Sequence, residues 1–319
     1  MQFDWEWCAI KKIAFLFPGQ GSQQVGMGRA LASEYPEIEE TLDKAGELIG
    51  IDLKQLCFFG PDAELTRTSN AQPALLAVSV ATMKIVAKHI TPAVVLGHSL
   101  GEYSALVACG AMRFEDAVLL VRKRGELMES AADGSGAMCA VIGLDLAQVE
   151  RVCRSVSEYG TVVPANINCP GQIVISGHRE AVRLAAEEAS RIGARRTVML
   201  NVSGAFHSPL METPARLFAP HLDAVPIRDA QVPIVSNVTG TAVWSGSEIK
   251  ELLLRQLTSP VRFEDCVRAL VQLGVDGCVE LGPQKVVSGL VRRTAKGMPV
   301  FNVETGQDVL ELLRFVKEE

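Results

Sequence analysis

Short aliphatic and β-branched runs alternate with helical patterns along most of this chain, and this alternation limits the folds that it can adopt. Strands are expected at 13–17, 94–96, 234–236 and 277–280. Helical patterns lie between the first two strands, at 27–35 and 72–88. Strands separated by helices are typical of parallel sheets, because a parallel connection must cross back over the sheet. The sequence therefore predicts an α/β core with a parallel sheet.

One stretch breaks this alternation and indicates a second, smaller unit. The order expected there is strand, helix, strand, strand, helix, strand, which is the βαββαβ order of ferredoxin-like units. The strands are expected at 137–142, 162–167, 172–176 and 197–202, and the helices at 145–156 and 179–192. A linker-like run precedes this stretch and Ser203-Gly204 closes it. We predict a ferredoxin-like subdomain at 134–203, inserted into a larger α/β domain formed by 13–133 and 204–319.

Length, charge and cysteine content narrow the class of protein. The chain has 319 residues, of which 48% are hydrophobic, enough for two domains or for one large core with an insertion. Its net charge of −6 gives no general attraction to phosphate backbones, so we expect no nucleic-acid partner. The eight cysteines include no C-x-x-C pair, which favours a reducing cytoplasm and predicts neither a metal site nor a disulfide framework.

Neither a secretory signal nor a membrane span is expected. Residues 1–12 carry Asp4 and Glu6 and lack a long apolar stretch, so we interpret them as an N-terminal extension. The longest uncharged stretch, 68–83, is interrupted by Pro73 and falls short of the roughly 20 apolar residues that cross a bilayer. We therefore predict a cytoplasmic protein without a membrane partner.

The segment Gly97-His98-Ser99-Leu100-Gly101 matches the G-x-S-x-G pattern of a nucleophile elbow. In such an elbow a serine occupies a strained turn between a strand and a helix. An apolar strand runs directly into the segment, and 102–109 reads as the helix that follows. Ser99 is therefore the candidate nucleophile. The alternative is a structural glycine turn that carries an incidental serine.

The first strand leads into a second glycine turn, Phe17-Pro18-Gly19-Gln20-Gly21-Ser22. Gln24 stands where a dinucleotide fingerprint needs a glycine, and the lysine of a phosphate-binding loop is missing. Acyl transfer needs two N–H donors for the developing oxyanion. By position these donors would be the main-chain N–H groups of Leu100 and Gln20, although such a turn can also be only a turn.

Five histidines could activate a serine: His89, His98, His178, His207 and His221. His98 adjoins Ser99, but we expect its side chain on the opposite side of the elbow. Three others lie in polar, helix-like surroundings typical of solvated surface histidines. His207 stands in a loop where the inserted unit returns to the core, and such loops often carry catalytic groups. Composition alone leaves a catalytic and a structural role for it equally open.

Arg124 is the most informative single position. It lies on the apolar stripe of a predicted helix at 115–129, together with Ala117, Val121 and Met128. A guanidinium that faces the core needs an anion, and its planar fork suits a free carboxylate. The alternatives are an arginine that reaches back to solvent and one that pairs with an internal carboxylate.

Together these segments resemble the malonyl-CoA:acyl carrier protein transacylases, in order and spacing, from about residue 13 to the end. The motifs are Phe17-Pro18-Gly19-Gln20-Gly21-Ser22, Gly97-His98-Ser99-Leu100-Gly101-Glu102-Tyr103, Arg124-Gly125, Asn168-Cys169-Pro170-Gly171-Gln172, Ala205-Phe206-His207-Ser208-Pro209 and Glu280-Leu281-Gly282-Pro283. The resemblance implies a hydrolase-like α/β domain with a ferredoxin-like insertion.

The resemblance also implies catalytic roles for matching positions. Ser99 corresponds to the nucleophile and His207 to the general base. Gln20 and Leu100 correspond to the oxyanion donors. Gln256 corresponds to a residue whose backbone carbonyl orients the histidine, so its side chain is expected to be dispensable.

Further positions bear on the substrate. Arg124 corresponds to the group that holds the malonyl carboxylate, and Phe206 before the histidine resembles the malonyl-selective form of this loop. Cys169 departs from the family pattern, in which a serine is commoner at this place in the turn. Its consequence for that turn is left open.

The implied reaction is a ping-pong transfer of malonyl from malonyl-CoA, through a malonyl-serine, to the phosphopantetheine thiol of an acyl carrier protein. No cofactor or metal is implied, and the family expectation is a monomer. A serine acyl hydrolase or editing thioesterase and a non-catalytic docking module for carrier proteins are the competing hypotheses. Whether the carrier serves fatty acid or polyketide synthesis is open.

Overall fold

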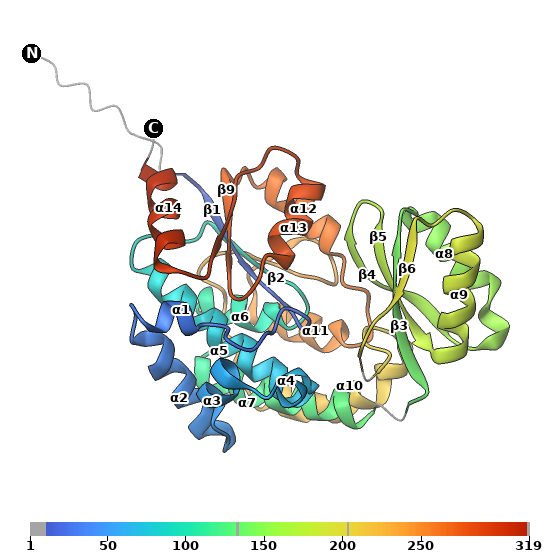
Figure 1. Cartoon of the computed structure of the whole chain (residues 1–319), viewed down its shortest axis with the longest axis horizontal. Coiled ribbons are helices and arrows are strands. Elements are labelled where there is room, and N and C mark those ends of the chain that lie inside the picture. The colour runs from blue at the N-terminus through green and yellow to red at the C-terminus, as the bar shows by residue number, and fades with distance from the viewer. Residues whose placement is uncertain (1–10, 132–133, 203, 318–319) are drawn as a thin grey trace, which may run out of the picture.

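Two sheets occupy separate parts of the computed structural model, which describes residues 11–131, 134–202 and 204–317 (Figure 1). The larger sheet has six strands in the order β10-β9-β1-β2-β7-β8. They are β1 (Ile13–Phe17), β2 (Val94–Gly97), β7 (Ile234–Val235), β8 (Ala242–Val243), β9 (Gly277–Leu281) and β10 (Val300–Val303). All neighbouring pairs are parallel except β7 and β8. The predicted α/β core with a parallel sheet is confirmed.

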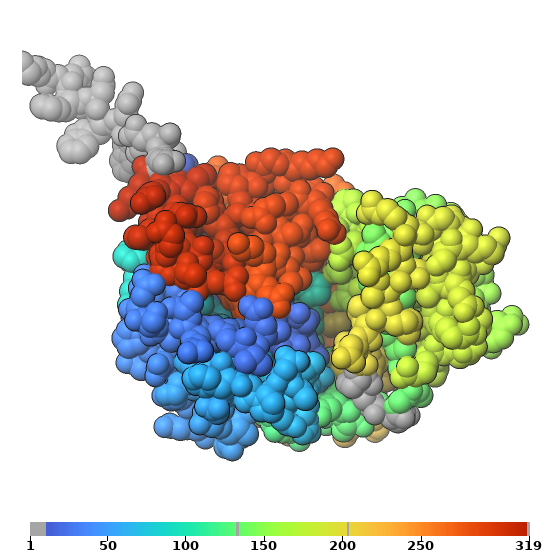
Figure 2. Space-filling view, in the orientation of Figure 1, coloured from blue at the N-terminus to red at the C-terminus, as the bar shows by residue number. Residues whose placement is uncertain are grey.

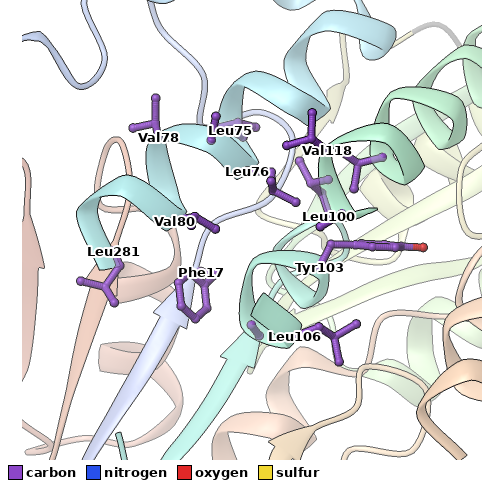
Figure 3. Close-up of a cluster of buried hydrophobic side chains, with 14 of the residues drawn as sticks. Phe17, Leu75, Leu76, Val78, Val80, Leu100, Tyr103, Leu106, Val118 and Leu281 are labelled. Atoms are coloured by element: carbon purple, nitrogen blue, oxygen red, sulfur yellow. The ribbon is translucent and has the colours of Figure 1, made fainter. Parts of the chain in front are cut away.

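The large sheet is buried on both faces, as β1 illustrates. Its five residues are all buried, and they alternate between two apolar clusters, one that contains Phe15 and Phe17 and one that contains Leu16. A parallel sheet needs this double cover because its crossover helices lie on both faces. The first cluster includes residues of α5 (Thr68–Ala87), α6 (Gly101–Ala108) and α7 (Phe114–Ser130), and the second includes residues of α12 (Phe263–Gln272) and α13 (Val286–Thr294). Figure 3 shows side chains of α5 and α6 gathered around Phe17, at the carboxyl end of β1.

Seven further helices complete the part built on the large sheet. They are α1 (Arg29–Ala32), α2 (Glu37–Ile49), α3 (Leu53–Phe59), α4 (Asp62–Thr66), α10 (Glu212–Asp223), α11 (Gly246–Gln256) and α14 (Gly306–Lys317). The predicted helix at 27–35 is reduced to the short α1. Gly26 and Gly28 have φ values of 97° and 80°, which a right-handed helix does not contain. β8 and β10 were not expected, since each is short and lacks a clear alternation.

The second sheet has four antiparallel strands in the order β4-β5-β3-β6. They are β3 (Gly136–Ile142), β4 (Val162–Cys169), β5 (Gln172–His178) and β6 (Arg196–Met199), with α8 (Leu146–Ser155) and α9 (Arg179–Arg191) packed against them. This sheet and its helices share an apolar cluster of their own. β6 ends before the predicted 202, and 200–202 belong to no strand or helix.

Strand β4 joins the second sheet to the segment between α11 and α12. Its residue Asn166 forms an isolated parallel bridge with Val261, in the segment between α11 and α12. The N–H of Ile167 donates to Val261 O at 2.8 Å, and the N–H of Val261 donates to Ala165 O at 2.8 Å. The second sheet is therefore fastened to the segment that precedes α12.

Three expectations concern the N-terminal extension, the boundaries of the inserted unit and the absence of a membrane span. Residues 1–10 of the proposed extension and the predicted boundaries at 132–133 and 203 lie outside the described residues. Lys11, which the sequence analysis assigned to this extension, donates from Nζ to Phe315 O at 2.5 Å. Helix α5 is long and apolar enough to cross a membrane by length and composition. However, 83% of its 18-residue apolar stretch is buried inside the protein.

Candidate active site

Ser99 occupies the turn between β2 and α6, at the carboxyl edge of the large sheet. Its φ of 51° lies in the left-handed region, which non-glycine residues rarely adopt. The neighbouring glycines allow the turn. A Cβ on Gly97 would lie 1.9 Å from the carbonyl carbon of Gly101, and a Cβ on Gly101 would lie 2.2 Å from Phe17 O. The strand, strained turn and helix predicted for an elbow are present.

His207 is the histidine that reaches Ser99. Its Nε2 lies 2.7 Å from Ser99 Oγ, and its Nδ1 lies 2.8 Å from the backbone carbonyl of Gln256. A carbonyl oxygen only accepts, so Nδ1 carries the proton and Nε2 is free to accept the proton of the serine hydroxyl. Burial, with a contribution from the nearby Arg124 guanidinium, lowers the pKa of His207 to about 3. The imidazole is therefore neutral near pH 7 and has the protonation state of a general base.

Among the described residues, no other histidine side chain forms a hydrogen bond with Ser99. His98 lines the same cavity, contrary to the expectation that it faces away, but its Nε2 bonds to Asn168 Oδ1 at 2.8 Å. Asn168 belongs to β4, and no pattern in the sequence predicted that this strand lies near the elbow. His178 accepts from the Thr161 N–H at 2.9 Å within the second sheet. His89 and His221 are exposed, as predicted.

Arg124 projects from α7 into the same site and is only 1% exposed. Its Nη1 donates to Gln72 Oε1 at 2.9 Å, and its Nη2 donates to Gln256 Oε1 at 3.0 Å and to Ser99 Oγ at 3.3 Å. Its Nε has no hydrogen-bond partner among the described residues. The guanidinium thus does not reach solvent, and it stands beside the nucleophile.

Arg124 forms no direct ion pair within the described ranges, and the buried carboxyl group of Glu102 reaches it only through the Gln256 side chain. Among the described residues no carboxylate oxygen lies within 4.0 Å of it, and its partners are two neutral amide oxygens and a hydroxyl. Burial lowers its pKa, but a guanidinium stays protonated in proteins. An unpaired buried cation is costly, so this site is suited to an anion supplied from outside. The internal ion pair considered from the sequence is absent from the described part of the chain.

A cavity of about 260 Å³ joins these groups. Its lining includes Ser99, Leu100, Gln20, Arg124, Phe206 and His207, so it unites six of the seven predicted site residues. Within the described ranges, neither the Leu100 N–H nor the Gln20 N–H donates a hydrogen bond to another group. Both remain available to an oxyanion. Met128 from α7 and Met138 from β3 add apolar surface.

The first glycine turn is held in place by a later motif. A Cβ on Gly282 would lie 2.7 Å from Pro18 Cγ, and a Cβ on Gly19 would lie 2.4 Å from His98 O. The turn therefore packs between the elbow and the segment that follows β9. This packing brings Gln20 to the cavity and explains the requirement for glycine at both positions.

Three buried polar residues of the site were missed by the sequence analysis: Gln72, Glu102 and Asn237. Asn237 accepts from the Ser99 N–H at 2.6 Å and donates from Nδ2 to Gly97 O at 2.7 Å. Glu102 accepts from the Asn237 N–H at 2.7 Å. Burial raises the pKa of Glu102 to about 7. A charged residue directly after the elbow, in an otherwise apolar helix, was the available signal for Glu102.

Gln256, which does not line the cavity, acts through more than its backbone. Its Oε1 accepts from Arg124, while its Nε2 donates to Ser99 O at 3.0 Å and to Glu102. The side chain was expected to be dispensable, because only the carbonyl was assigned a role. Its contacts tie Arg124 to the elbow and argue against that expectation.

Other features of the described chain do not coincide with this cavity. A second cavity, of about 370 Å³, lies between 24–31 and the ends of β9 and β10, and contains none of the predicted site residues. No group of three or more His, Cys, Asp or Glu side chains suited to a metal ion occurs among the described residues. The seven cysteines within these ranges are buried and unpaired.

Comparison with known proteins places this architecture in a family. Residues 14–309 match the model of the acyl transferase domain. The malonyl CoA-acyl carrier protein transacylase of Bacillus subtilis is 47% identical over 97% of this chain and 99% of its own length. The solved transacylase of the same name from Coxiella burnetii is 36% identical, with a TM-score of 0.95 over 97% of this chain and 99% of its own. A malonyl-transacylase solved in complex with a type II PKS acyl-carrier protein is 39% identical, with a TM-score of 0.93 over 95% and 99% of the two chains.

Proposed function

Because this chain belongs to the acyl transferase domain family, we propose that it moves a malonyl group from malonyl-CoA to the phosphopantetheine thiol of an acyl carrier protein. The observation that carries the proposal is the buried Arg124 guanidinium, which stands 3.3 Å from Ser99 Oγ without a carboxylate partner. A malonyl group on Ser99 would bring a free carboxylate to that guanidinium. The fork of an arginine suits two-point contact with a carboxylate.

Ser99 attacks the thioester in the first half-reaction. His207 Nε2 takes the hydroxyl proton as the oxygen forms a bond to the malonyl carbonyl carbon. The resulting oxyanion accepts from the N–H groups of Gln20 and Leu100. As the intermediate collapses, the carbon–sulfur bond breaks and His207 returns the proton to the coenzyme A thiolate. The malonyl group is left as an ester of Ser99.

The second half-reaction repeats these steps with the carrier thiol. His207 takes the thiol proton, the sulfur attacks the ester, and the proton returns to Ser99 as the transfer is completed. The carbonyl of Gln256, which accepts from His207 Nδ1, does the orienting work that a carboxylate does in a serine–histidine–aspartate triad. The residues of this chain and the two substrates balance the reaction, so no cofactor or metal enters the proposal.

The same proposal includes the acyl group selected, the protein partner, and the location and oligomeric state of the enzyme. Phe206, 5% exposed in the loop before His207, limits the space beside the acyl group and favours malonyl over branched substrates. The partner is an acyl carrier protein, as in the solved complex of a similar transacylase. The reaction takes place in the cytoplasm on a monomer, without a membrane or nucleic acid.

We also propose that the chain divides into a hydrolase-like domain of 13–133 and 204–319 and a ferredoxin-like subdomain of 134–203, after an extension of 1–12. The order β4-β5-β3-β6 supports the ferredoxin-like assignment, because the first and third strands of the βαββαβ unit are adjacent at its centre. The separate apolar cluster of this sheet supports its treatment as a subdomain.

Trapping the acyl-enzyme tests the function. Incubation with malonyl-CoA alone, followed by intact mass measurement, should yield one malonyl adduct on the wild type and none on Ser99→Ala. Ser104→Ala, on the helix that follows the elbow, is the matched control and should keep the adduct. Rapid turnover without a persistent adduct would favour an acyl hydrolase, and no reaction would favour a docking module. An adduct on Ser99→Ala would overturn the nucleophile assignment.

A further inference from the structure

Glu102 is a buried carboxyl group for which the transfer reaction gives no role. It follows the elbow on α6, is 3% exposed, and forms no ion pair within 4.0 Å among the described residues. One oxygen accepts from the main-chain N–H of Asn237 at 2.7 Å, and the other accepts from Gln256 Nε2. Burial of a carboxyl group at this depth costs free energy unless hydrogen bonds or a counter-charge compensate for the lost water.

The orientation of the Gln256 side chain, which faces Glu102, is fixed by its other partners. Gln256 must direct Oε1 to Arg124, which only donates, and Nε2 to Ser99 O, which only accepts. Asn237 faces Glu102 with its main-chain N–H, which can only donate, while its side-chain Oδ1 accepts from the Ser99 N–H and its Nδ2 donates to Gly97 O. The Gln256 amide cannot turn over without losing its contacts to Arg124 and to the elbow. Both groups that face Glu102 are therefore N–H donors.

Two facing donors require two acceptors on Glu102. An ionised carboxylate supplies two strong acceptors, whereas protonation turns one oxygen into a hydroxyl, which is a weaker acceptor and adds an O–H donor between two N–H groups. We propose that Glu102, as a carboxylate, is a positioning residue that holds Asn237 and Gln256, and through them the Ser99 backbone, the His207 acceptor and the Arg124 guanidinium. This inference rests on the proposed function of the same site.

The environment of Glu102 sets the pH at which this positioning would fail. Its charged and titratable neighbours are Arg124 from α7, Tyr103 on its own helix and Cys266 from α12. Burial raises its pKa to about 7, against the lowering effects of the Asn237 and Gln256 hydrogen bonds and of Arg124. Protonation below pH 7 would weaken one of the two acceptors and add a donor. His207, whose pKa is lowered to about 3, would not cause a loss of activity in that range.

Glu280 is a matched control elsewhere in the fold. It lies on β9, is fully buried, and accepts from the N–H groups of Val287 at 3.0 Å and Ser288 at 2.7 Å. Burial raises its pKa as well. These contacts join Glu280 to the start of α13 and to none of the groups around Ser99. Its role is therefore structural, although its chemistry closely parallels that of Glu102.

The test compares pH profiles of kcat/KM for malonyl transfer from pH 5.5 to 9 on the wild type, Glu102→Gln and Glu280→Gln. Wild type and Glu280→Gln should lose activity as the pH falls through about 7. Glu102→Gln should lose roughly tenfold or more at pH 8, where an amide hydrogen meets a donor, and its profile should be flat between pH 6 and 8. Melting temperatures of all three proteins separate this effect from lost stability.

The result that contradicts the proposal is a Glu102→Gln protein that keeps the wild-type fall near pH 7 or stays within twofold of wild type at pH 8. A wild-type profile without that fall contradicts it equally, even if Glu102→Gln does not fold. A second probe keeps this result apart from a failure of the malonyl assignment. Labelling of Ser99 by phenylmethylsulfonyl fluoride requires an aligned Ser99 and His207 but no malonyl group, and should show the same pH dependence and the same loss in Glu102→Gln.

Discussion

The two sheets of this protein contribute to the cavity in different ways. The parallel sheet brings the ends of β1, β2 and β7 to one edge, where Gln20, Ser99 and Asn237 follow them. The antiparallel sheet contributes Met138 and Asn166 to the lining and packs around an apolar cluster of its own. In Figure 2 the yellow and green part of the molecule that holds this sheet lies to one side of the rest. The groups assigned to bond making lie on the first part, and the second part supplies one side of the space in which they work.

This difference follows from how strands end. Carboxyl ends of parallel strands meet at the same edge, so residues far apart in sequence converge there. In an antiparallel sheet successive strands end at opposite edges, and functional groups at strand ends are separated. The contrast predicts that substitutions on the parallel-sheet side change the reaction itself, whereas those on the antiparallel side change mainly stability and fit.

The largest effect expected in this comparison is that of Arg124→Ala. A malonyl carboxylate left without its partner should cost about 3 to 5 kcal/mol, or roughly a hundredfold to a few thousandfold in kcat/KM for malonyl-CoA. Acetyl-CoA carries no carboxylate, so its transfer should hold or rise. Measurement of both substrates, with a melting curve, decides the matter. Parallel losses for both substrates together with a lower melting temperature would instead indicate a structural arginine.

The sequence predicts the catalytic residues beside the parallel sheet better than it predicts the buried hydrogen bonds that hold them. Ser99 follows an apolar strand in a recognisable pattern, and Arg124 interrupts an apolar stripe at helical spacing, so each carries a local signal. Glu102 and Gln256 meet partners 135 and 157 positions away. Such contacts depend on how the strands are ordered in the sheet, which spacing along the chain does not encode.

The second effect concerns Gln256→Ala. The backbone carbonyl that accepts from His207 would remain, but Arg124, Glu102 and Ser99 O would each lose a partner. We expect a loss of about 2 kcal/mol, or roughly thirtyfold in kcat/KM for malonyl-CoA, because hydrogen bonds to charged groups are worth more than neutral ones. Kinetics with acetyl-CoA should fall less, since Arg124 is not needed there. A loss below about threefold would restore the view that only the carbonyl of Gln256 acts.

The smallest effect uses two methionines of the same cavity, one from each part of the molecule. Met128 on α7 is 3% exposed and Met138 on β3 is 4% exposed, so truncation of either to alanine removes a similar amount of buried surface. Met128 Sδ also lies 3.4 Å from Gln72 Nε2, and Gln72 holds Arg124. Both variants should lose about 2 to 5 kcal/mol of unfolding free energy, measured by denaturant titration.

Their kinetics should nevertheless differ. Met128→Ala frees the Gln72 amide that orients Arg124, so kcat/KM for malonyl-CoA should fall about fivefold relative to acetyl-CoA, a change of about 1 kcal/mol. Within the described ranges the Met138 side chain forms no hydrogen bond with a partner of Arg124, so in Met138→Ala the ratio of kcat/KM for the two substrates should stay within about twofold of wild type. Equal shifts of the malonyl-CoA to acetyl-CoA ratio in the two variants would mean that the antiparallel sheet also takes part in selecting the acyl group. The two sheets would then not differ in function as proposed.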